Sequence, residues 1–196
     1  MKNLKDYILH LDNWIPKKLI NTSIKKIDIN PNWSRHSWTN AQSYNSKSLF
    51  GEKELDVLHQ DELNPNESKL IQELQKCVWK AVEKYILIDK LGGNLFTGWK
   101  GFSPIRFNKY GKGQSMAKHY DHIHSLFDGQ VRGIPILSIV AVLNDDYEGG
   151  EFIMFDDYEI KFKSGDLIIF PSVFLYPHLV KPVKKGIRYS FVSWVY

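Results

Sequence analysis

The chain has 196 residues, of which 43% are hydrophobic and 24% are charged, and it carries a net charge of +4. This balance excludes a disordered chain, and the length suits one folded domain spanning residues 1–196. The single cysteine, Cys77, excludes an internal disulfide and a metal site built from several thiolates.

The N-terminal segment contains one short apolar run in the sequence MKNLKDYILHLDNW, and charged and polar residues interrupt it. Such a run is too short for a membrane span or for the apolar part of a signal sequence, so we expect a cytoplasmic protein. Lysines occur in separate pairs, such as Lys17–Lys18, Lys25–Lys26 and Lys184–Lys185. This spacing favours an ordinary solvated surface over a nucleic-acid-binding patch.

Two helices are predicted in residues 1–95. The first begins at Pro16 and extends to about Lys26, with the apolar residues Leu19, Ile20, Ile24 and Ile27 at helical spacing. Residues 28–50 are rich in loop-forming residues. The second helix begins with Asn66 as its N-cap, and apolar residues then recur every three or four positions as far as Ile86. Cys77 falls on the apolar face of this helix.

After Gly92–Gly93 the sequence consists of short runs rich in β-branched and aromatic residues, separated by turn-forming residues. These runs predict seven or eight strands, at 97–109, 115–121, 136–143, 151–155, 158–163, 166–170, 177–182 and 187–195. The turn into one of them contains Gly149, Gly150 and Glu151. We therefore expect an α+β, mainly β fold, in which an antiparallel jelly-roll or cupin-like sandwich carries the helices on one outer face.

A candidate metal site lies in the segment KHYDHIHS. In an extended strand the side chains of His119 and Asp121 project to one face, and that of Tyr120 to the other. His178, in the later run LYPHLVKPV, is the candidate third ligand. Two imidazoles and one carboxylate leave three coordination positions open, an arrangement typical of non-haem Fe(II). Taken alone, the triplet leaves surface histidines and a zinc site as alternatives.

Arg188 favours iron over these alternatives. It lies in the run GIRYSFVSWVY, where Arg188, Ser190, Val192 and Trp194 share one face of the predicted strand. A guanidinium inside a barrel requires an anion, and its planar fork suits a carboxylate. A dicarboxylic keto acid would bind the metal at one end and Arg188 at the other.

From about Ile105 to Tyr196 the chain resembles the prolyl 4-hydroxylase-like branch of the 2-oxoglutarate/Fe(II) dioxygenases, whose core is a double-stranded β-helix. The resemblance is carried by RFNKYGKGQSMAKHYDHIHS, LSIVAVLNDDYEGGEFIMF and GDLIIFPSVFLYPHLVKPVKKGIRYSFVSWVY. It implies that the iron ligands and catalytic centre are His119, Asp121 and His178. It also implies that Arg188 binds the distal carboxylate of 2-oxoglutarate, that the Tyr110 hydroxyl binds the same molecule, and that Trp194 lines the pocket.

Two positions depart from the family pattern. Met116 stands where many prolyl hydroxylases of this branch carry a tyrosine next to the substrate, and Arg188 replaces the lysine of several relatives. His122 and His124 also lie close to the candidate ligands, but neither shares the strand face of His119, so we interpret them as loop residues or as supports of the ligands. Ascorbate is a further candidate cofactor.

The resemblance implies hydroxylation of a peptide or protein residue, with proline the expected target, while O2 is consumed and 2-oxoglutarate is decarboxylated to succinate. Residues 96–196 would form the catalytic β core and residues 1–95 a helical support region. The loop from about Ile123 to Pro135, which contains Gly129 and Gly133, would form a mobile cover. Alternatives are the same chemistry on a small molecule or a methylated nucleic-acid base, or a non-catalytic cupin-like binding module. Trp194 disfavours a methylated nucleic-acid base as the substrate, because the demethylases that act on such bases carry a second arginine at this position.

Overall fold

The computed structural model describes residues 2–36, 53–91, 99–121 and 135–196. Its larger sheet has seven antiparallel strands in the order β1 (Leu9–Leu11), β10 (Leu167–Pro171), β6 (Leu137–Val142), β13 (Arg188–Val195), β4 (Arg106–Tyr110), β3 (Asp56–His59) and β2 (Ser34–Arg35). A second sheet contains β5 (Met116–His119), β11 (His178–Val180), β8 (Phe152–Met154) and β9 (Tyr158–Ile160). The short strands β12 (Val183–Lys185) and β7 (Glu148–Gly149) pair with each other.

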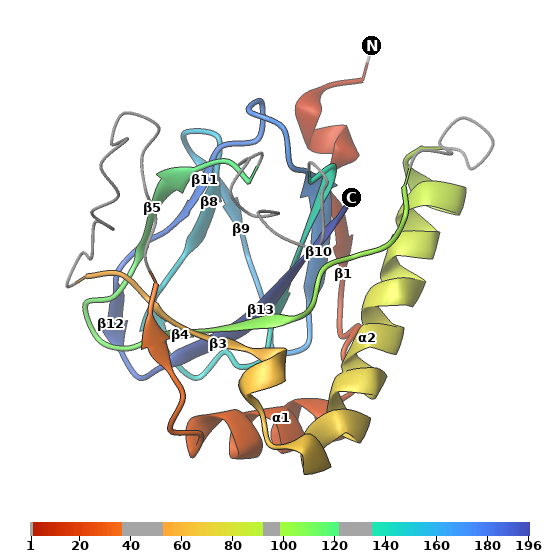
Figure 1. The fold of residues 1–196 in the computed structure, drawn as a ribbon. Helices are drawn as coiled ribbons and strands as arrows, with labels where there is room; N and C mark the ends of the chain where they lie inside the picture. Colours follow the sequence, from red (N-terminus) through yellow and green to blue (C-terminus); the bar gives the residue numbers. More distant parts are fainter. Residues whose placement is uncertain (1, 37–52, 92–98, 122–134) are drawn as a thin grey trace, which may run out of the picture.

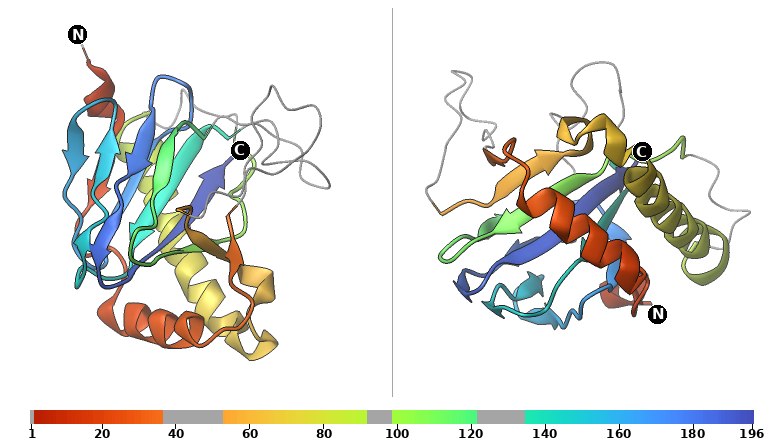
Figure 2. Two further views of the ribbon diagram at one scale, coloured as in Figure 1. Left: turned by 90° about the vertical axis from the view of Figure 1, so that its left-hand side faces the viewer. Right: turned by 90° about the horizontal axis from the view of Figure 1, so that it is seen from below.

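The seven-stranded and four-stranded sheets face each other, and the four-stranded sheet lies on the left in Figure 1. This is the double-stranded β-helix that the sequence predicted. The helices α1 (Lys17–Asp28) and α2 (Ser68–Glu83) lie on the outer face of the larger sheet, and α1 crosses its strands in the right-hand view of Figure 2. The predicted packing of helices on one outer face is therefore confirmed.

The two predicted helices are confirmed, but the predicted cap of the second is wrong. The first starts directly after Pro16, as expected. The second is preceded by the 3-10 turn η3 (Pro65–Glu67), and the side chain of Asn64 accepts a hydrogen bond from the Asn66 N–H. Pro65 favours the first position of a helical turn, so Asn64 caps this preceding turn, and α2 itself starts after Glu67 without a side-chain cap. Further short helical turns are η1 (Leu4–Tyr7), η2 (Gln60–Glu62) and the π-helical η4 (Lys84–Asp89).

Apolar residues form two layers, one on each face of the larger sheet. Between that sheet and the helices, Phe107 and Phe191 pack with buried residues of α2 such as Leu74. Between the two sheets, Val192 packs with Phe152 and other residues of the smaller sheet. Alternate residues of β13 thus point to opposite layers, and the predicted inward face contains Arg188, Ser190, Val192 and Trp194.

The first half of the chain contributes strands that the sequence did not predict. β3 pairs with β4, and β1 pairs with β10 at the other edge of the same sheet. These strands have three or four residues, too few to show an alternating pattern. The region expected to be a helical support therefore also extends the sheet that positions the site.

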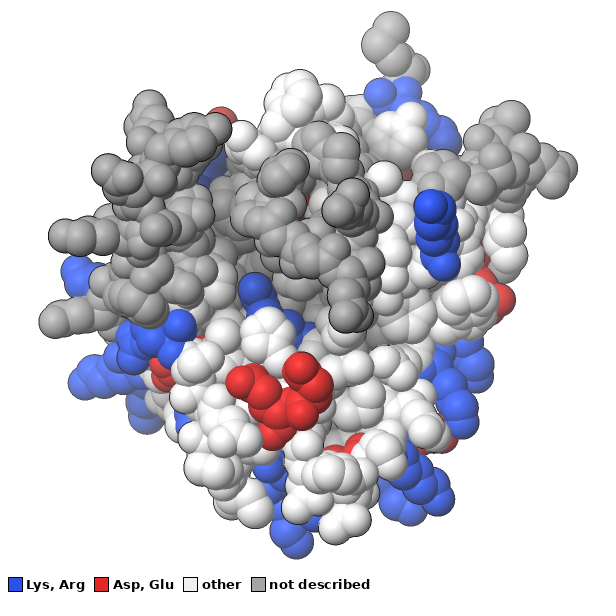
Figure 3. Space-filling model, in the orientation of Figure 1, with Lys and Arg blue, Asp and Glu red and all other residues white. Residues whose placement is uncertain are grey.

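Among the described residues, no helix is long and apolar enough to cross a membrane. On the face shown in Figure 3, the described Lys and Arg side chains gather in separate small groups, and acidic groups lie among them. The described residues of this face therefore form no continuous basic patch. The cytoplasmic location remains a prediction.

Candidate active site

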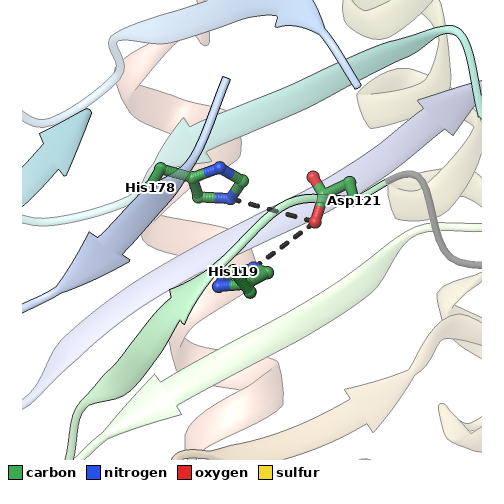
Figure 4. A group of neighbouring side chains, drawn as sticks. All are labelled: His119, Asp121 and His178. Carbon is green, nitrogen blue, oxygen red and sulfur yellow. Dashed lines mark ion pairs between the residues drawn. The ribbon is translucent and has the colours of Figure 1, made fainter. Parts of the chain in front are cut away.

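The structure brings together the three candidate metal ligands, His119 and Asp121 from one strand face and His178 from the later run. His119 ends β5, Asp121 follows two positions later, and His178 begins β11 directly opposite His119 in the register of the two strands. The Asp121 Oδ1 atom lies 3.4 Å from His119 Nε2 and 3.8 Å from His178 Nε2 (Figure 4). One potential ligand atom from each residue lies within 4.8 Å of the others, a spacing that allows them to bind one cation.

Neighbouring groups fix the orientation of these side chains. The Nδ1–H of His119 donates to the Ala117 carbonyl at 2.7 Å, and the Nδ1–H of His178 donates to the Tyr176 carbonyl at 3.1 Å. Each ring therefore keeps a proton on Nδ1 and turns its Nε2 atom towards the centre. The Ser138 hydroxyl donates to Asp121 Oδ2 at 2.6 Å, which leaves Oδ1 to face the imidazoles.

The charge states also suit a metal. Burial lowers the pKa of His178 to about 4. Burial alone would raise the pKa of Asp121, but the two imidazoles and the Ser138 hydroxyl outweigh it and hold that pKa well below its usual range. Burial opposes the charged form of His119, but its close contact with Asp121 outweighs burial and raises its pKa. At neutral pH Asp121 is ionised and His178 is neutral, the forms in which each binds a cation.

Arg188 lies in the same cavity with most of its hydrogen-bonding capacity unused. Its exposed fraction is 1%, and its Nη1 donates to the Ser190 hydroxyl at 3.0 Å. Its Nε and Nη2 have no hydrogen-bond partner among the described residues. The guanidinium lies 5.1 Å from the centre of the Tyr110 ring. A buried guanidinium with two free donors on one edge fits a carboxylate, so the structure supports the anion predicted there.

Gly150 makes room for this arginine. Its φ is +66°, and a Cβ atom at this position would lie 3.1 Å from Arg188 Cδ. A larger residue would therefore be strained and would press on the guanidinium stem. The Gly149–Gly150 turn, predicted for its folding role, also shapes the cavity.

The other residues predicted by resemblance line the cavity too. Tyr110 is buried, and burial raises its pKa, so its hydroxyl keeps the proton that it would donate. The Nε1–H of Trp194 is buried and has no partner among the described residues. Met116 lies on the wall, as its position next to the substrate implied. His122, His124 and all but the last residue of the expected cover loop, residues 123–135, lie outside the described residues.

Sequence reasoning missed two polar residues of the cavity, Arg106 and Asn108. Both precede Tyr110 in β4 at alternate positions, and Asn108 is buried. The rule of alternation that selected the inward face of β13 would also have selected them. The complete described lining is Arg106, Asn108, Tyr110, Met116, His119, Asp121, Val140, Phe152, His178, Val180, Arg188, Ser190, Val192 and Trp194.

Comparison with known proteins identifies the family. The model of the 2OG-Fe(II) oxygenase superfamily matches residues 105–196. A PKHD-type hydroxylase of Xylella fastidiosa (strain M23) is 32% identical over 176 aligned positions, and the match covers 81% of this chain and 68% of that protein. The chain belongs to the PKHD-type hydroxylase family of 2OG-Fe(II) oxygenases.

The PKHD-type relatives differ in how much of their length this chain spans. One from Stenotrophomonas maltophilia (strain R551-3) is 34% identical over 136 aligned positions, and the match covers 67% of this chain and 57% of that protein. Another, from Xylella fastidiosa (strain M12), is 38% identical over 109 residues, which are 44% of its length. The chain therefore spans only about half of some relatives.

Solved structures share the fold of this PKHD-type chain. A Pseudomonas putida prolyl-4-hydroxylase has a TM-score of 0.68 at 18% identity, over 97% of this chain and 92% of its own. A viral collagen prolyl hydroxylase from Paramecium Bursaria Chlorella virus-1, in complex with 2OG, has a TM-score of 0.66 at 17% identity, over 96% of this chain and 94% of its own. The prolyl 4-hydroxylase-like fold predicted from the sequence is therefore confirmed.

The family name contains the two cofactors that the sequence predicted, Fe(II) and 2-oxoglutarate. The cavity of this PKHD-type oxygenase fits both, because two imidazole nitrogens and one carboxylate oxygen suit Fe(II), and the Arg188 donors without a partner among the described residues suit a distal carboxylate. Ascorbate remains a prediction.

Proposed function

We propose that the chain is an Fe(II)- and 2-oxoglutarate-dependent dioxygenase that hydroxylates a peptide or protein residue, with proline as the target. The observation that carries this proposal is the placement of the free Arg188 donors in one cavity with His119, Asp121 and His178. The names of the relatives and the shared fold of prolyl hydroxylases support the choice of reaction and target.

In this proposal His119, Asp121 and His178 hold Fe(II), and the Nε and Nη2 donors of Arg188 bind the distal carboxylate of 2-oxoglutarate. The Tyr110 ring lies beside the Arg188 guanidinium, and we assign its hydroxyl as a further donor to that carboxylate. Bound Fe(II), with 2-oxoglutarate and dioxygen, would supply the oxidising power that converts C–H to C–OH while 2-oxoglutarate becomes succinate and CO2.

The remaining walls hold the reactants and limit water. Val140, Val192 and Phe152 are buried and line the cavity between the sheets. An apolar lining strengthens the attraction between Arg188 and a carboxylate, because little water competes for the charge. We therefore assign binding and orientation to the polar residues and exclusion of solvent to the apolar ones.

We also propose that residues 1–196 act as one unit. β1 and β3, from the first half of the chain, are hydrogen-bonded to β10 and β4 of the second half. The residues that hold the site therefore depend on strands from both halves.

A screen of proline-containing peptides tests the function. The protein, Fe(II) and 2-oxoglutarate are incubated with the peptides, and mass spectrometry measures succinate and the gain of one oxygen atom. We expect both products from the wild type and neither above background from His178→Ala, because the latter lacks a metal ligand. His59→Ala, at an exposed histidine of β3, is the matched control and is expected to retain both. Absence of succinate with every peptide, or oxidation that survives His178→Ala, would contradict the proposal.

A further inference from the structure

A second guanidinium lines the cavity, and the roles assigned so far do not use it. Arg106 begins β4, two inward positions before Tyr110. In the sheet register Arg106 pairs with Val192 and Tyr110 pairs with Arg188. The two arginines therefore project from one face at levels that differ by about 13 Å of strand, at roughly 3.3 Å per residue.

Arg106 lies at the end of the cavity that carries the candidate metal ligands. Its guanidinium is 5.1 Å from the centre of the Trp194 ring. Trp194 pairs with Ser138 across the sheet, and Ser138 donates to Asp121. A carboxylate bound by Arg188 at the other end is therefore not the natural partner of Arg106.

Arg106 has no carboxylate partner within ion-pair distance among the described residues. Its Nε donates to the Asn108 amide oxygen at 3.2 Å, which leaves the two terminal nitrogens for another acceptor. Asp121, the one carboxylate among the described lining residues, is already engaged by two imidazoles and Ser138. Burial lowers the pKa of Arg106, the direction expected for a cation without a close counter-charge.

The charges of the cavity leave one positive charge in excess. Arg106 and Arg188 are opposed by Asp121 alone among the described lining residues at neutral pH, apart from the histidines. A divalent metal and a doubly charged dicarboxylate would add equal and opposite charges, so the excess would persist in the loaded site. A further anion would neutralise it, and the Trp194 Nε1–H, for which the described part of the chain supplies no acceptor, offers a nearby donor.

We propose that Arg106 determines substrate specificity by binding a carboxylate of the primary substrate beside the metal ligands. The inference rests on the proposed function of the site and narrows its substrate class. The carboxylate belongs either to a free amino acid or to an acidic residue next to proline in a peptide. Arg suits either source, because its terminal nitrogens can donate two parallel hydrogen bonds.

Paired substrates test the role of Arg106. Free L-proline is compared with L-prolinamide, and a blocked peptide containing Pro-Asp with the same peptide containing Pro-Asn. We expect the wild type to favour the carboxylate member of at least one pair by about tenfold or more in kcat/KM, mainly through KM. The pair that shows this preference identifies the source of the carboxylate.

Variants separate recognition from a structural role. Arg106→Gln is expected to bring the preference close to one, and Arg106→Lys to restore part of it, because lysine keeps the charge but not the planar fork. Lys112→Gln, which removes an exposed charge just after β4, is the matched control and should retain the preference. A wild type without any preference, or a preference that survives Arg106→Gln, would overturn the proposal.

Binding without turnover distinguishes this inference from the proposed function. Calorimetry with the Fe(II)-loaded protein and 2-oxoglutarate, with dioxygen excluded, measures the Kd of the same paired probes even if no product forms in air. We expect Arg106→Gln to weaken the binding of the carboxylate probe about tenfold or more and to weaken the binding of 2-oxoglutarate much less. A larger loss of 2-oxoglutarate binding would place Arg106 in the co-substrate site and refute the inference, whereas binding without succinate formation would refute the proposed function alone.

Discussion

Single residues outside the candidate metal ligands orient the side chains of those ligands. Asp121 has two carboxylate oxygens, and the hydrogen bond from Ser138 engages one of them and directs the other towards the imidazoles. Ser138 in turn lies 2.8 Å from the Ser172 hydroxyl. Such supporting hydrogen bonds orient a ligand and maintain its charge, so their loss should weaken metal binding without removing a ligand.

Ser138→Ala tests this support. We expect the variant to bind Fe(II) about 10- to 100-fold more weakly than the wild type, because the carboxylate loses its fixed orientation. Calorimetric titration under exclusion of dioxygen measures the Kd. Ser193→Ala is the matched control, because Ser193 is also buried but donates to the Ser103 carbonyl, away from the triad. Equal weakening in both variants would contradict the role of Ser138.

The lowered pKa of His178 predicts how stability depends on pH in the metal-free protein. In the unfolded chain this histidine takes up a proton near pH 6.5, whereas in the folded protein it stays neutral down to about pH 4. The unfolded state therefore binds more protons in this interval, and stability falls as the pH falls through it.

Urea unfolding at several pH values measures this effect. Between pH 6.5 and 4.5 the free energy of unfolding of His178→Gln is expected to fall by about 2 kcal/mol less than that of the wild type. The variant lacks the group that takes up a proton in this interval only in the unfolded chain. His59→Gln, at an exposed position, is the matched control for the substitution itself. A slope in His178→Gln equal to that of the wild type would contradict the assignment.

The sequence predicted the residues of the site that follow a simple rule. His119 and Asp121 share a face because residues alternate in a strand, and Arg188 shares a face with Trp194 for the same reason. The rule says nothing about which strands pair, so the sequence could not show that Arg106 lies over the Trp194 ring. Nor could it show that Ser138 reaches Asp121, because that contact depends on how the two sheets face each other.

At the scale of elements, α2 illustrates how the helices support the sheet from outside the site. Leu74 is fully buried in the layer between the helices and the larger sheet. The Tyr85 hydroxyl, just beyond α2, donates to the Tyr7 carbonyl at 2.7 Å and so links this helical region to the start of the chain. Packing of this kind contributes to stability but does not touch the cavity.

Leu74→Ala is therefore expected to lower stability while leaving the assembled site intact. The free energy of unfolding should fall by about 2–5 kcal/mol, because a buried leucine leaves a cavity when it is truncated. Urea unfolding measures the loss. Lys76→Ala, at an exposed position of the same helix, should change stability by less than about 0.5 kcal/mol. A loss below about 1 kcal/mol in Leu74→Ala would show that α2 is not packed as described.

The elements that the sequence predicted well are those with a long pattern. α2 has four turns of apolar periodicity, and β13 has eight residues of alternation. β1 and β3 have three and four residues, and each is a strand only because a distant strand provides its hydrogen bonds. Local sequence carries little information about such pairings. The cap at Asn64 was missed for a different reason, since Pro65 shifts the start of the turn.

At the scale of the whole molecule, ligands that bind the folded protein alone should raise its melting temperature. Fe(II) with 2-oxoglutarate, at about a hundred times the Kd, is expected to raise Tm by roughly 5–10 °C. Thermal unfolding without dioxygen measures the shift, and a chelator should reverse it. Asp121→Ala should show little or no shift, whereas Asp156→Asn, which removes an exposed carboxylate paired with Lys118, should respond like the wild type. A full shift in Asp121→Ala would contradict the ligand assignment.

β1 has a consequence for how molecules of this protein behave towards one another. It covers the outer edge of β10, whose residues Leu167 to Phe170 are fully buried. If residues 1–11 were deleted, β10 would become an open apolar edge with unsatisfied backbone groups, ready to pair with the same edge of another molecule. We expect the shortened protein to aggregate at concentrations where the full chain elutes as a single species in size-exclusion chromatography. β1, which contributes no residue to the described lining of the cavity, thus protects the sheet from self-association.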